Sequence, residues 1–263
     1  MTPAQLTGTT DSHLQSTMVG QKAFLMHPDV ANDLLNMIEA ATKAGFKMEI
    51  ASGFRDFSRQ RAIWNGKFEG ELPILDSNSL PLNKAALSDE EKLKAILRWS
   101  ALPGGSRHHW GCDFDVYARN LLPPDTKLQL EPWEYLEGHQ LAFYCWLKDH
   151  IDEFGFFFPY LQDLGGVAIE PWHISHKAIG QQCAAQLNAE MLKDELVRQN
   201  QQHNIAGLES ILNNLDSILS TYIRNITPPP EAYDRISYQP WVIIIVVLSV
   251  IIGNIAALKY TAK

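Results

Sequence analysis

Cysteine is scarce in this 263-residue chain, and positive charge is in deficit. Its three cysteines, Cys112, Cys145 and Cys183, are widely spaced without a CxxC pair, which excludes a disulfide framework and a zinc-finger pattern and favours a reducing compartment. The 22 lysines and arginines face 30 acidic residues, a net charge of -8, and form no cluster interleaved with aromatic residues. The footprint of a nucleic-acid-binding protein is therefore missing, and we expect no nucleic-acid partner.

The N-terminus shows neither the basic nor the apolar stretch of a secretory signal. Apolar residues make up 46% of the chain, which is ample for a packed core. The run Trp241 to Leu258 carries no charge and would span roughly 27 Å as a helix, just enough to cross a bilayer core. Trp241 and Tyr260 flank it as interfacial aromatics would. We predict a C-terminal membrane anchor; a buried core helix is the alternative.

Hydrophobic periodicity switches between helix and strand over the first 180 residues. Ser88 and Glu91 form the pattern of a capping box at the start of one helix. The loop-like residues 70–87 precede it. The 3.6-residue period predicts helices over 21–45, 55–67, 88–99 and 134–154. Alternation predicts strands over 46–54 and 112–118, and residues 167–175 form a strand-like run that Pro171 interrupts.

After residue 177 the chain becomes helical and amphipathic, with helices expected over 180–199 and 205–223. The apolar stripe on the second helix indicates packing and would also allow self-association. The "TPPPE" segment is typical of a stiff spacer. We therefore expect a catalytic domain over 1–180, a helical stalk over 181–226, a proline-containing linker over 227–240 and a transmembrane helix over 241–258.

The stretch "GGSRHHWGCDFDVYA", residues 104–118, carries the first sign of chemistry. Alternation along its strand-like half places Asp113 and Asp115 on one face, with Cys112 on the opposite, core side. A catalytic zinc needs three protein ligands of the histidine and carboxylate type and a fourth position for water. His108, Asp115 and His173 are the candidates.

Two further residues suit hydrolysis at such a metal. Glu170 stands three residues before His173 and can serve as general base for the bound water. Arg55 follows a predicted strand, where a fixed positive charge can stabilise a developing oxyanion; a surface salt bridge is the alternative. His109 could replace His108 as ligand, could support the site from behind the ligands, or could face the substrate.

Three motifs carry a family resemblance. "SRHHWGCDFD" and "EPWH" resemble the SxHxxGx(A/D)xD and ExWH signatures of the M15 metallopeptidases, the family of VanY-like D,D-carboxypeptidases and LdcB-like L,D-carboxypeptidases of bacterial peptidoglycan. "SGFRDFSRQ" resembles the family's SGYRSxxxQ segment. The resemblance covers roughly residues 20–180 and implies an α+β fold, with a small antiparallel sheet carrying the zinc ligands and helices flanking it.

The resemblance also implies roles for individual residues. His108, Asp115 and His173 would bind Zn2+, and Glu170 would be the base. Arg55 would bind a peptide oxygen or the terminal carboxylate of the substrate. Lesser substrate contacts would come from Ser52, Gln60, Ser106 and Trp172. The chain departs from the family at Phe54, which replaces a tyrosine, and at residues 68–98, which look like an inserted wall or lid.

The sequence thus predicts a zinc carboxypeptidase acting on peptidoglycan stem peptides. An anchor at the C-terminus predicts a protein of the bacterial inner membrane with its catalytic domain in the cytoplasm. Pentapeptide precursors in the cytoplasm must keep their terminal D-Ala-D-Ala for later cross-linking, so an active D,D-carboxypeptidase there would deplete them. We therefore expect an L,D-carboxypeptidase that trims recycled tetrapeptides. The alternatives are a D,D-carboxypeptidase, an endopeptidase and a non-catalytic module that binds cell-wall peptides.

Overall fold

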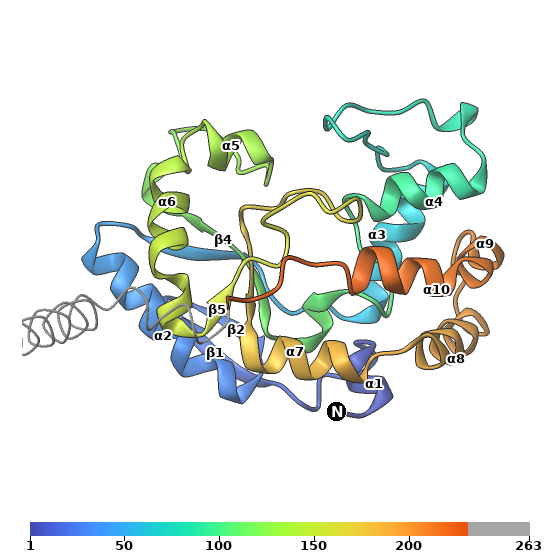
Figure 1. Ribbon diagram of the computed structural model, residues 1–263, viewed down its shortest axis with the longest axis horizontal. Coiled ribbons are helices and arrows are strands. Elements are labelled where there is room, and N and C mark those ends of the chain that lie inside the picture. The colour runs from blue at the N-terminus through green and yellow to red at the C-terminus, as the bar shows by residue number, and fades with distance from the viewer. Residues whose placement is uncertain (231–263) are drawn as a thin grey trace, which may run out of the picture. The chain divides into compact units, whose positions relative to one another are not determined.

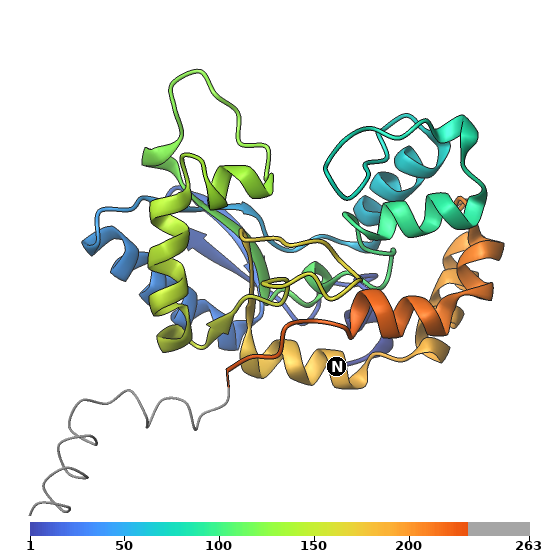
Figure 2. The ribbon, with the colours of Figure 1, turned by 45° about the horizontal axis from the view of Figure 1, so that its top comes forward.

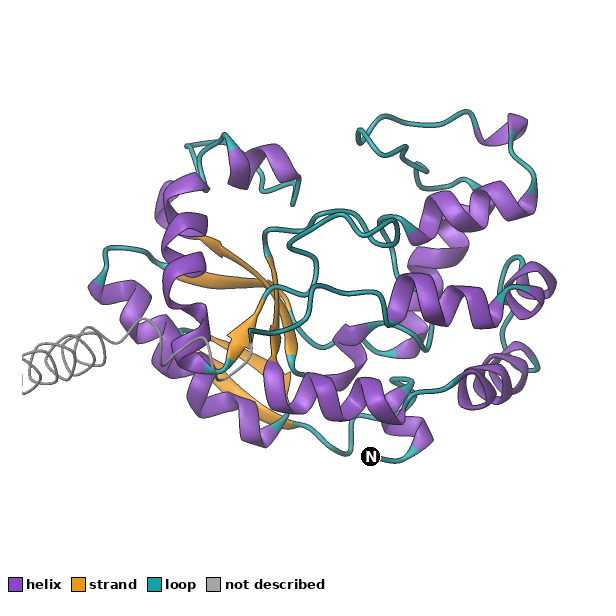
Figure 3. Cartoon of the chain, in the orientation of Figure 1, coloured by secondary structure: helices purple, strands orange, loops and turns teal. Residues whose placement is uncertain are grey.

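An antiparallel sheet of order β3-β4-β6-β5 lies at the centre of the part of the chain that the computed structural model describes, residues 1–230. Its strands are β3 (Met48–Ser52), β4 (Asp113–Ala118), β5 (Phe156–Phe157) and β6 (His173–His176). Figures 1 and 3 show the strands gathered in the middle with helices around them. The expected α+β fold with a small antiparallel sheet is confirmed.

The register of the sheet aligns polar residues from three strands. Asp115 on β4 pairs with His173 on β6 and, on its other side, with Ser52 on β3. An irregularity between Ile50 and Ser52 shifts the β3 register just before this row. Because directly opposed residues on adjacent strands lie about 5 Å apart, the pairing brings a predicted carboxylate ligand beside a predicted histidine ligand.

A separate hairpin precedes the sheet and corrects one expectation. Residues 21–45 were predicted as one helix, but β1 (Gln15–Val19) pairs with β2 (Lys22–Met26), and α2 begins only at Pro28 (Pro28–Lys43). Proline has no amide hydrogen and suits the first turn of a helix, and the His27 ring accepts a hydrogen bond from the Asp29 amide. The helical pattern was therefore real only after residue 27.

The remaining helices largely follow the predicted pattern. Helix α3 begins after its cap, Asp56, and α4 carries the predicted capping box between Ser88 and Glu91. The predicted strand over 167–175 shortens to β6, because Pro171 cannot donate a ladder hydrogen bond. The bounds are α1 Pro3–Leu6, α3 Phe57–Glu69, α4 Asp89–Leu97, α5 Pro132–Leu136, α6 Leu141–His150, α7 Lys177–Gln186, α8 Ala189–Asn200, α9 Leu208–Asn213 and α10 Leu215–Ile218. The short 3-10 helices are η1 Lys84–Ala86, η2 Arg107–Trp110, η3 Arg119–Leu121 and η4 Ile151–Phe154, and η5 Leu219–Ile223 is a π-helical turn.

The predicted stalk is part of the domain. Residues 1–228 form one compact unit, with no break at residue 180. The Trp64 indole donates to the Ala206 carbonyl at 2.9 Å, and Asn225 Nδ2 donates to the Leu164 carbonyl at 2.8 Å. The predicted apolar stripe of the last helices packs into the shared core. Its buried members are Ile205, Ile211, Leu215, Ile218 and Leu219, and its partly buried members are Leu208, Leu212 and Tyr222.

The predicted transmembrane helix does not lie in the part of the chain that the structure describes. Within residues 1–230, no helix is both long enough and apolar enough to cross a bilayer. The predicted transmembrane run 241–258, and the linker from residue 231 onward, lie outside the described residues.

Candidate active site

The three predicted metal ligands come together in the structure. One ligand atom each from His108, Asp115 and His173 lies within 4.8 Å of the others, and all three residues are buried. His108 sits on the short turn η2, which ends at Gly111 in the left-handed conformation (φ +67°). This positive φ strains any residue with a side chain, and a Cβ at Gly111 would also lie 3.1 Å from the backbone nitrogen of His27, so glycine suits the turn from His108 into β4.

Distances between the donor atoms fit zinc. His108 Nε2 lies 3.5 Å from Asp115 Oδ2, and His173 Nδ1 lies 3.2 Å from Asp115 Oδ1. Tetrahedral zinc with bonds of 2.0–2.1 Å holds its donors about 3.3 Å apart. Each histidine nitrogen therefore lies about as far from an Asp115 oxygen as two zinc-bound donors do from each other. One atom from each of the three residues lies within 4.8 Å of the others, so the three could hold a zinc ion and leave a fourth position for water.

The second nitrogen of each ring is held by a partner that fixes its orientation. His108 Nδ1 lies 2.9 Å from the Gly53 carbonyl, and His173 Nε2 lies 2.9 Å from Asp113 Oδ2. Asp113 is itself fixed by Arg107 Nε at 2.7 Å and by the Ser175 hydroxyl at 2.8 Å. Such outer partners are typical of metal-binding histidines, because they leave the other nitrogen's lone pair free for the ion.

The charges of the cluster also favour binding of a cation. Burial lowers the pKa of His108 to about 3, so this ring is a neutral ligand. Burial also disfavours charge on His173, but hydrogen bonds to Asp113, Asp115 and Glu170 outweigh it and hold the pKa of His173 well above its usual range. Three carboxylates around one imidazole attract positive charge, which a divalent ion supplies in place of a proton.

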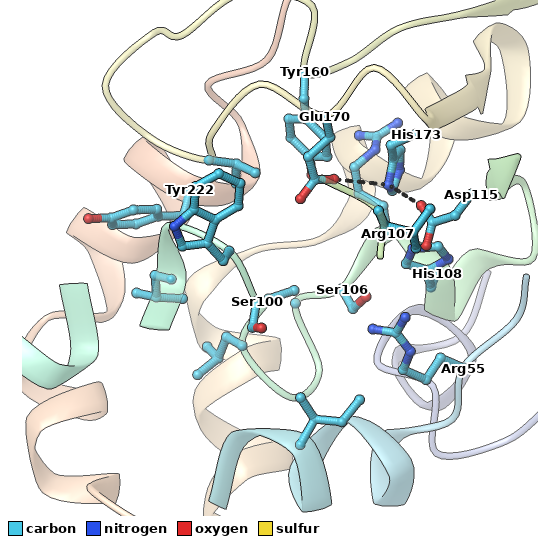
Figure 4. Close-up of a pocket in the computed structure, with 18 of the residues that line it drawn as sticks. Arg55, Ser100, Ser106, Arg107, His108, Asp115, Tyr160, Glu170, His173 and Tyr222 are labelled. Atoms are coloured by element: carbon cyan, nitrogen blue, oxygen red, sulfur yellow. Dashed lines mark ion pairs between the residues drawn. The ribbon is translucent and has the colours of Figure 1, made fainter. Parts of the chain in front are cut away.

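Glu170 lies beside the donors, as predicted for a general base. Its Oε2 is 3.3 Å from His173 Nδ1, and its side chain is only 13% exposed. Figure 4 shows the carboxylate facing the pocket next to His173. Burial raises the pKa of the Glu170 carboxyl, Asp115 raises it further, and His173 and Arg55 oppose the shift. A carboxylate with a raised pKa is a better proton acceptor at neutral pH.

Arg55 presents a positive charge that neutral groups hold in place. Its guanidinium donates to Gln60 Oε1 at 2.8 Å and to the Ser52 hydroxyl at 3.1 Å, while its buried Nε has no hydrogen-bond partner among residues 1–230. Burial lowers the pKa of Arg55 and the nearby carboxylates of Asp115 and Glu170 raise it, but within residues 1–230 no carboxylate forms an ion pair with its guanidinium. The salt-bridge alternative is therefore not found, and the charge is available to a substrate oxygen in the pocket.

Ser52 and Gln60, two of the predicted substrate contacts, lie behind Arg55 and not in the pocket. Gln60 is fully buried, accepting from Arg55 and donating to the Ala101 carbonyl at 2.7 Å, and Ser52 likewise contacts Arg55. Both residues orient Arg55 rather than lining the pocket. Ser106 and Trp172 do line it.

Arg55→Lys is expected to lower kcat/KM by about 10- to 100-fold, because a lysine cannot reproduce a planar fork held by Ser52 and Gln60. Steady-state kinetics on a stem peptide measure the effect. Arg59→Lys, at an exposed position on the same helix, is the matched control and should match the wild-type rate. A wild-type rate in Arg55→Lys would make the guanidinium structural.

The pocket has a volume of about 320 Å³ and joins three regions of the chain. Residues 68–98, which were predicted to be an insertion, contribute Leu75 and Leu97, and the last helical turn contributes Tyr222 and Ile223. In Figures 1 and 2 the α3–α4 region and the α5–α6 region stand on opposite sides of the central loops. Ser79 Oγ donates to Glu131 Oε2 at 2.7 Å, which joins the inserted segment to the rim before α5.

His109 is not a member of the metal cluster. It is fully buried, with Nδ1 2.6 Å from the Arg55 carbonyl and Nε2 accepting from the Gly104 amide at 3.1 Å. It therefore fixes the backbone of Arg55, and it faces neither a ligand position nor the substrate. Cys112 is buried in the core, as predicted.

The sequence analysis did not identify Arg107 and Ser175, which hold the Asp113 carboxylate in place. Arg107 and Ser175 both bond this carboxylate and are buried, and Arg107 Nη2 also donates to Ser175 Oγ at 2.6 Å. Asp113 shares a strand face with Asp115, which was the available signal that its carboxylate serves the same site.

Comparisons with known proteins agree with this geometry. The family model described as VanY, D-alanyl-D-alanine carboxypeptidase, matches residues 23–179, and a model of a family of unknown function matches residues 236–263. An uncharacterized protein of Haemophilus influenzae is 34% identical over 125 residues, which cover 46% of this chain and 92% of that protein. The putative carboxypeptidase YodJ of Bacillus subtilis is 26% identical over 160 residues, 59% of this chain and 47% of that protein.

Solved structures with a similar chain path include VanYB in complex with D-alanine-D-alanine, with 20% identity, a TM-score of 0.45, and coverage of 69% of this chain and 88% of that one. The L,D-carboxypeptidase DacB from Streptococcus pneumoniae has 23% identity and a TM-score of 0.38, with coverage of 70% and 92%.

The VanY match spans more than half of the chain, and the chain therefore belongs to the family of VanY D-alanyl-D-alanine carboxypeptidases. With two histidines and an aspartate at zinc spacing and a glutamate beside them, it is a zinc metallocarboxypeptidase.

Proposed function

We propose that this chain removes the terminal D-alanine from peptidoglycan stem peptides, and that it cuts tetrapeptides between the third residue and D-alanine. The observation that carries the hydrolytic part is the position of Glu170, 3.3 Å from a metal-donor nitrogen and facing the same pocket as Arg55. A module that only binds peptides has no use for a partly buried base beside a metal site.

The residues divide the reaction between them. Zinc, when bound to the three donors, supplies a Lewis acid and lowers the pKa of water. Glu170 accepts a proton from the attacking water and delivers it to the amine of the leaving D-alanine. The Arg55 guanidinium, fixed from behind by Ser52 and Gln60, stabilises the negative charge that develops on the scissile carbonyl oxygen.

The boundaries of the pocket favour an exopeptidase. Figure 4 places Tyr222 at the end of the pocket far from His108 and Asp115, with Ser100 and Ser106 between them. Tyr222 and Ile223 come from the C-terminal helices, which pack against the domain and so limit the pocket on that side. An endopeptidase needs a cleft through which the peptide continues in both directions.

The choice of bond rests on the residue before the cut. In a tetrapeptide this residue is a long diamino acid such as meso-diaminopimelate, whereas in a pentapeptide it is D-alanine with a methyl side chain. A pocket of about 320 Å³ with polar residues at its rim, Gln129 and Glu131, suits the longer, charged side chain. The family description instead favours the D,D reaction, which is therefore the second candidate.

Defined muropeptides separate the two candidates. The purified chain, loaded with zinc, is incubated with tetrapeptide and pentapeptide substrates, and the products are identified by mass. We expect tetrapeptide to become tripeptide, with pentapeptide largely intact. Conversion of pentapeptide to tetrapeptide with no further trimming would establish the D,D activity instead.

We also propose that the run 241–258 tethers the enzyme to the inner membrane with the domain in the cytoplasm. The free thiols of Cys112 and Cys183, buried side by side, support a reducing compartment. An N-terminal reporter that works only in the periplasm should be inactive; an active reporter would reverse the topology.

A further inference from the structure

Lys67 is a second cation in the pocket, and no motif pointed to it. It lies in the last turn of α3, one turn beyond Ile63, and both residues line the pocket. Residues four apart share a helix face, and Gln60, which holds Arg55, lies seven residues before Lys67 on that face. The helix thus directs its lysine toward the space that Arg55 and Glu170 also line.

The end of the helix does not need this lysine. A cation in the last turn often serves the free carbonyls there. Here Lys84 Nζ donates to the carbonyls of Glu69 and Gly70 at 3.1 and 3.0 Å. The Gly70 amide donates to the carbonyls of Gly66 and Lys67. Lys84 therefore caps the C-terminal end of α3, and the ammonium of Lys67 is not needed there.

No carboxylate within the described residues forms an ion pair with Lys67. Its ammonium forms no ion pair or hydrogen bond with another side chain of residues 1–230. Burial lowers the pKa of Lys67, and the nearby Arg55 lowers it further, while Glu170 raises it. Two cations that repel each other in one pocket are stabilised when an anion binds between or beside them.

We propose that Lys67 binds the C-terminal carboxylate of the substrate and that Arg55 is thereby reserved for the scissile carbonyl oxygen. The inference rests on the proposed carboxypeptidase function, because only an exopeptidase has a carboxylate one residue beyond the cut. One residue spans at most about 3.6 Å, so the carboxylate must lie close to the catalytic groups. Lys67 lines the same pocket as Glu170 and Arg55.

The chemistry of the two cations suits this division. The Arg55 fork is already oriented by Ser52 and Gln60, which gives it a fixed direction toward one oxygen. A lysine ammonium is a compact charge on a flexible stem, and it can follow a carboxylate that leaves with the product. Lys67 is therefore a substrate-binding residue that selects peptides with a free C-terminus.

The test compares Lys67→Met with wild type on the cleaved stem peptide as free acid and as C-terminal amide. A hydrogen bond to a charged group accounts for about a 10- to 100-fold change in affinity. We expect Lys67→Met to lose that factor in kcat/KM on the acid, mainly through KM. On the amide, wild type and variant should be equally poor. Lys67→Arg should retain most of the preference for the acid.

The control is Lys43→Met, which removes an exposed lysine on α2 that pairs only with Glu39. Zinc content and Tm of all variants establish that each is folded and loaded. An equal loss on acid and amide, or no loss on the acid, would overturn the proposal.

Binding without turnover separates this inference from the proposed bond specificity. In a Glu170→Gln background, calorimetry compares the Kd of acid and amide forms of both tetrapeptide and pentapeptide. If pentapeptide proves to be the substrate, the L,D assignment fails while the role of Lys67 is tested on the pentapeptide. If the acid binds no better than the amide with Lys67 present, the role of Lys67 is refuted whichever bond is cut.

Discussion

Glu170→Gln is expected to lower kcat by about 100- to 10,000-fold while zinc remains bound. The substitution keeps the shape of the side chain and removes only the ability to accept a proton. Glu170 Oε2 lies 3.3 Å from His173 Nδ1, and the site retains Asp113 and Asp115 around that ring. Metal analysis should therefore give one zinc per chain, and single-turnover kinetics should locate the loss in the chemical step.

The matched control is Glu137→Gln, an exposed glutamate just after α5, which should keep the wild-type rate. A Glu170→Gln enzyme that turns over at nearly the wild-type rate would show that another group takes the proton. Loss of zinc from this variant would instead identify Glu170 as a ligand.

His173→Ala is expected to remove both the zinc and the activity. His173 supplies one of the three donors, and its loss leaves Asp115 with His108 alone, which is too few protein ligands for tight binding. The Asp113 carboxylate keeps its partners Arg107 and Ser175, so the core around it should remain folded. Metal content by mass spectrometry and the circular dichroism spectrum measure the two effects separately.

The control for this variant is His203→Ala, at an exposed position after α8. In wild type, a chelator should abolish activity, and added zinc should restore it; neither treatment should affect His173→Ala. A full complement of zinc in His173→Ala would refute the ligand assignment.

The metal cluster could be predicted because the segments around His108, Asp115 and His173 resemble the family signatures and contain residue types that suit zinc; local pattern alone did not bring His173 to the site. Alternation placed Asp115 on a polar strand face, and the pairing of β4 with β6 sets His173 directly opposite. The capping box at Ser88 is equally local and was equally readable. Where one short segment determines the geometry, the sequence is sufficient.

Long-range packing was beyond the sequence. The Arg107 ion pair with Asp113 depends on how η2 folds back over the sheet, and the pairing of β1 with β2 overrode a helical pattern. The amphipathic stripe of the last helices correctly predicted that these residues are buried, but it did not indicate that they pack against the catalytic domain. No sequence pattern indicated the proposed role of Lys67, because this role depends on Lys84 capping the end of the helix in its place.

The packing of the last helices sets the smallest piece of this protein that can work. A gene truncated at residue 180 would leave the Trp64 indole without its acceptor at Ala206 and would remove Tyr222 and Ile223 from the pocket. Such a fragment would expose apolar core to water and aggregate during expression. C-terminal fusion partners, purification tags and protease sites therefore belong beyond Ile223, and a stop codon soon after His173 would give inactive protein for reasons of folding alone.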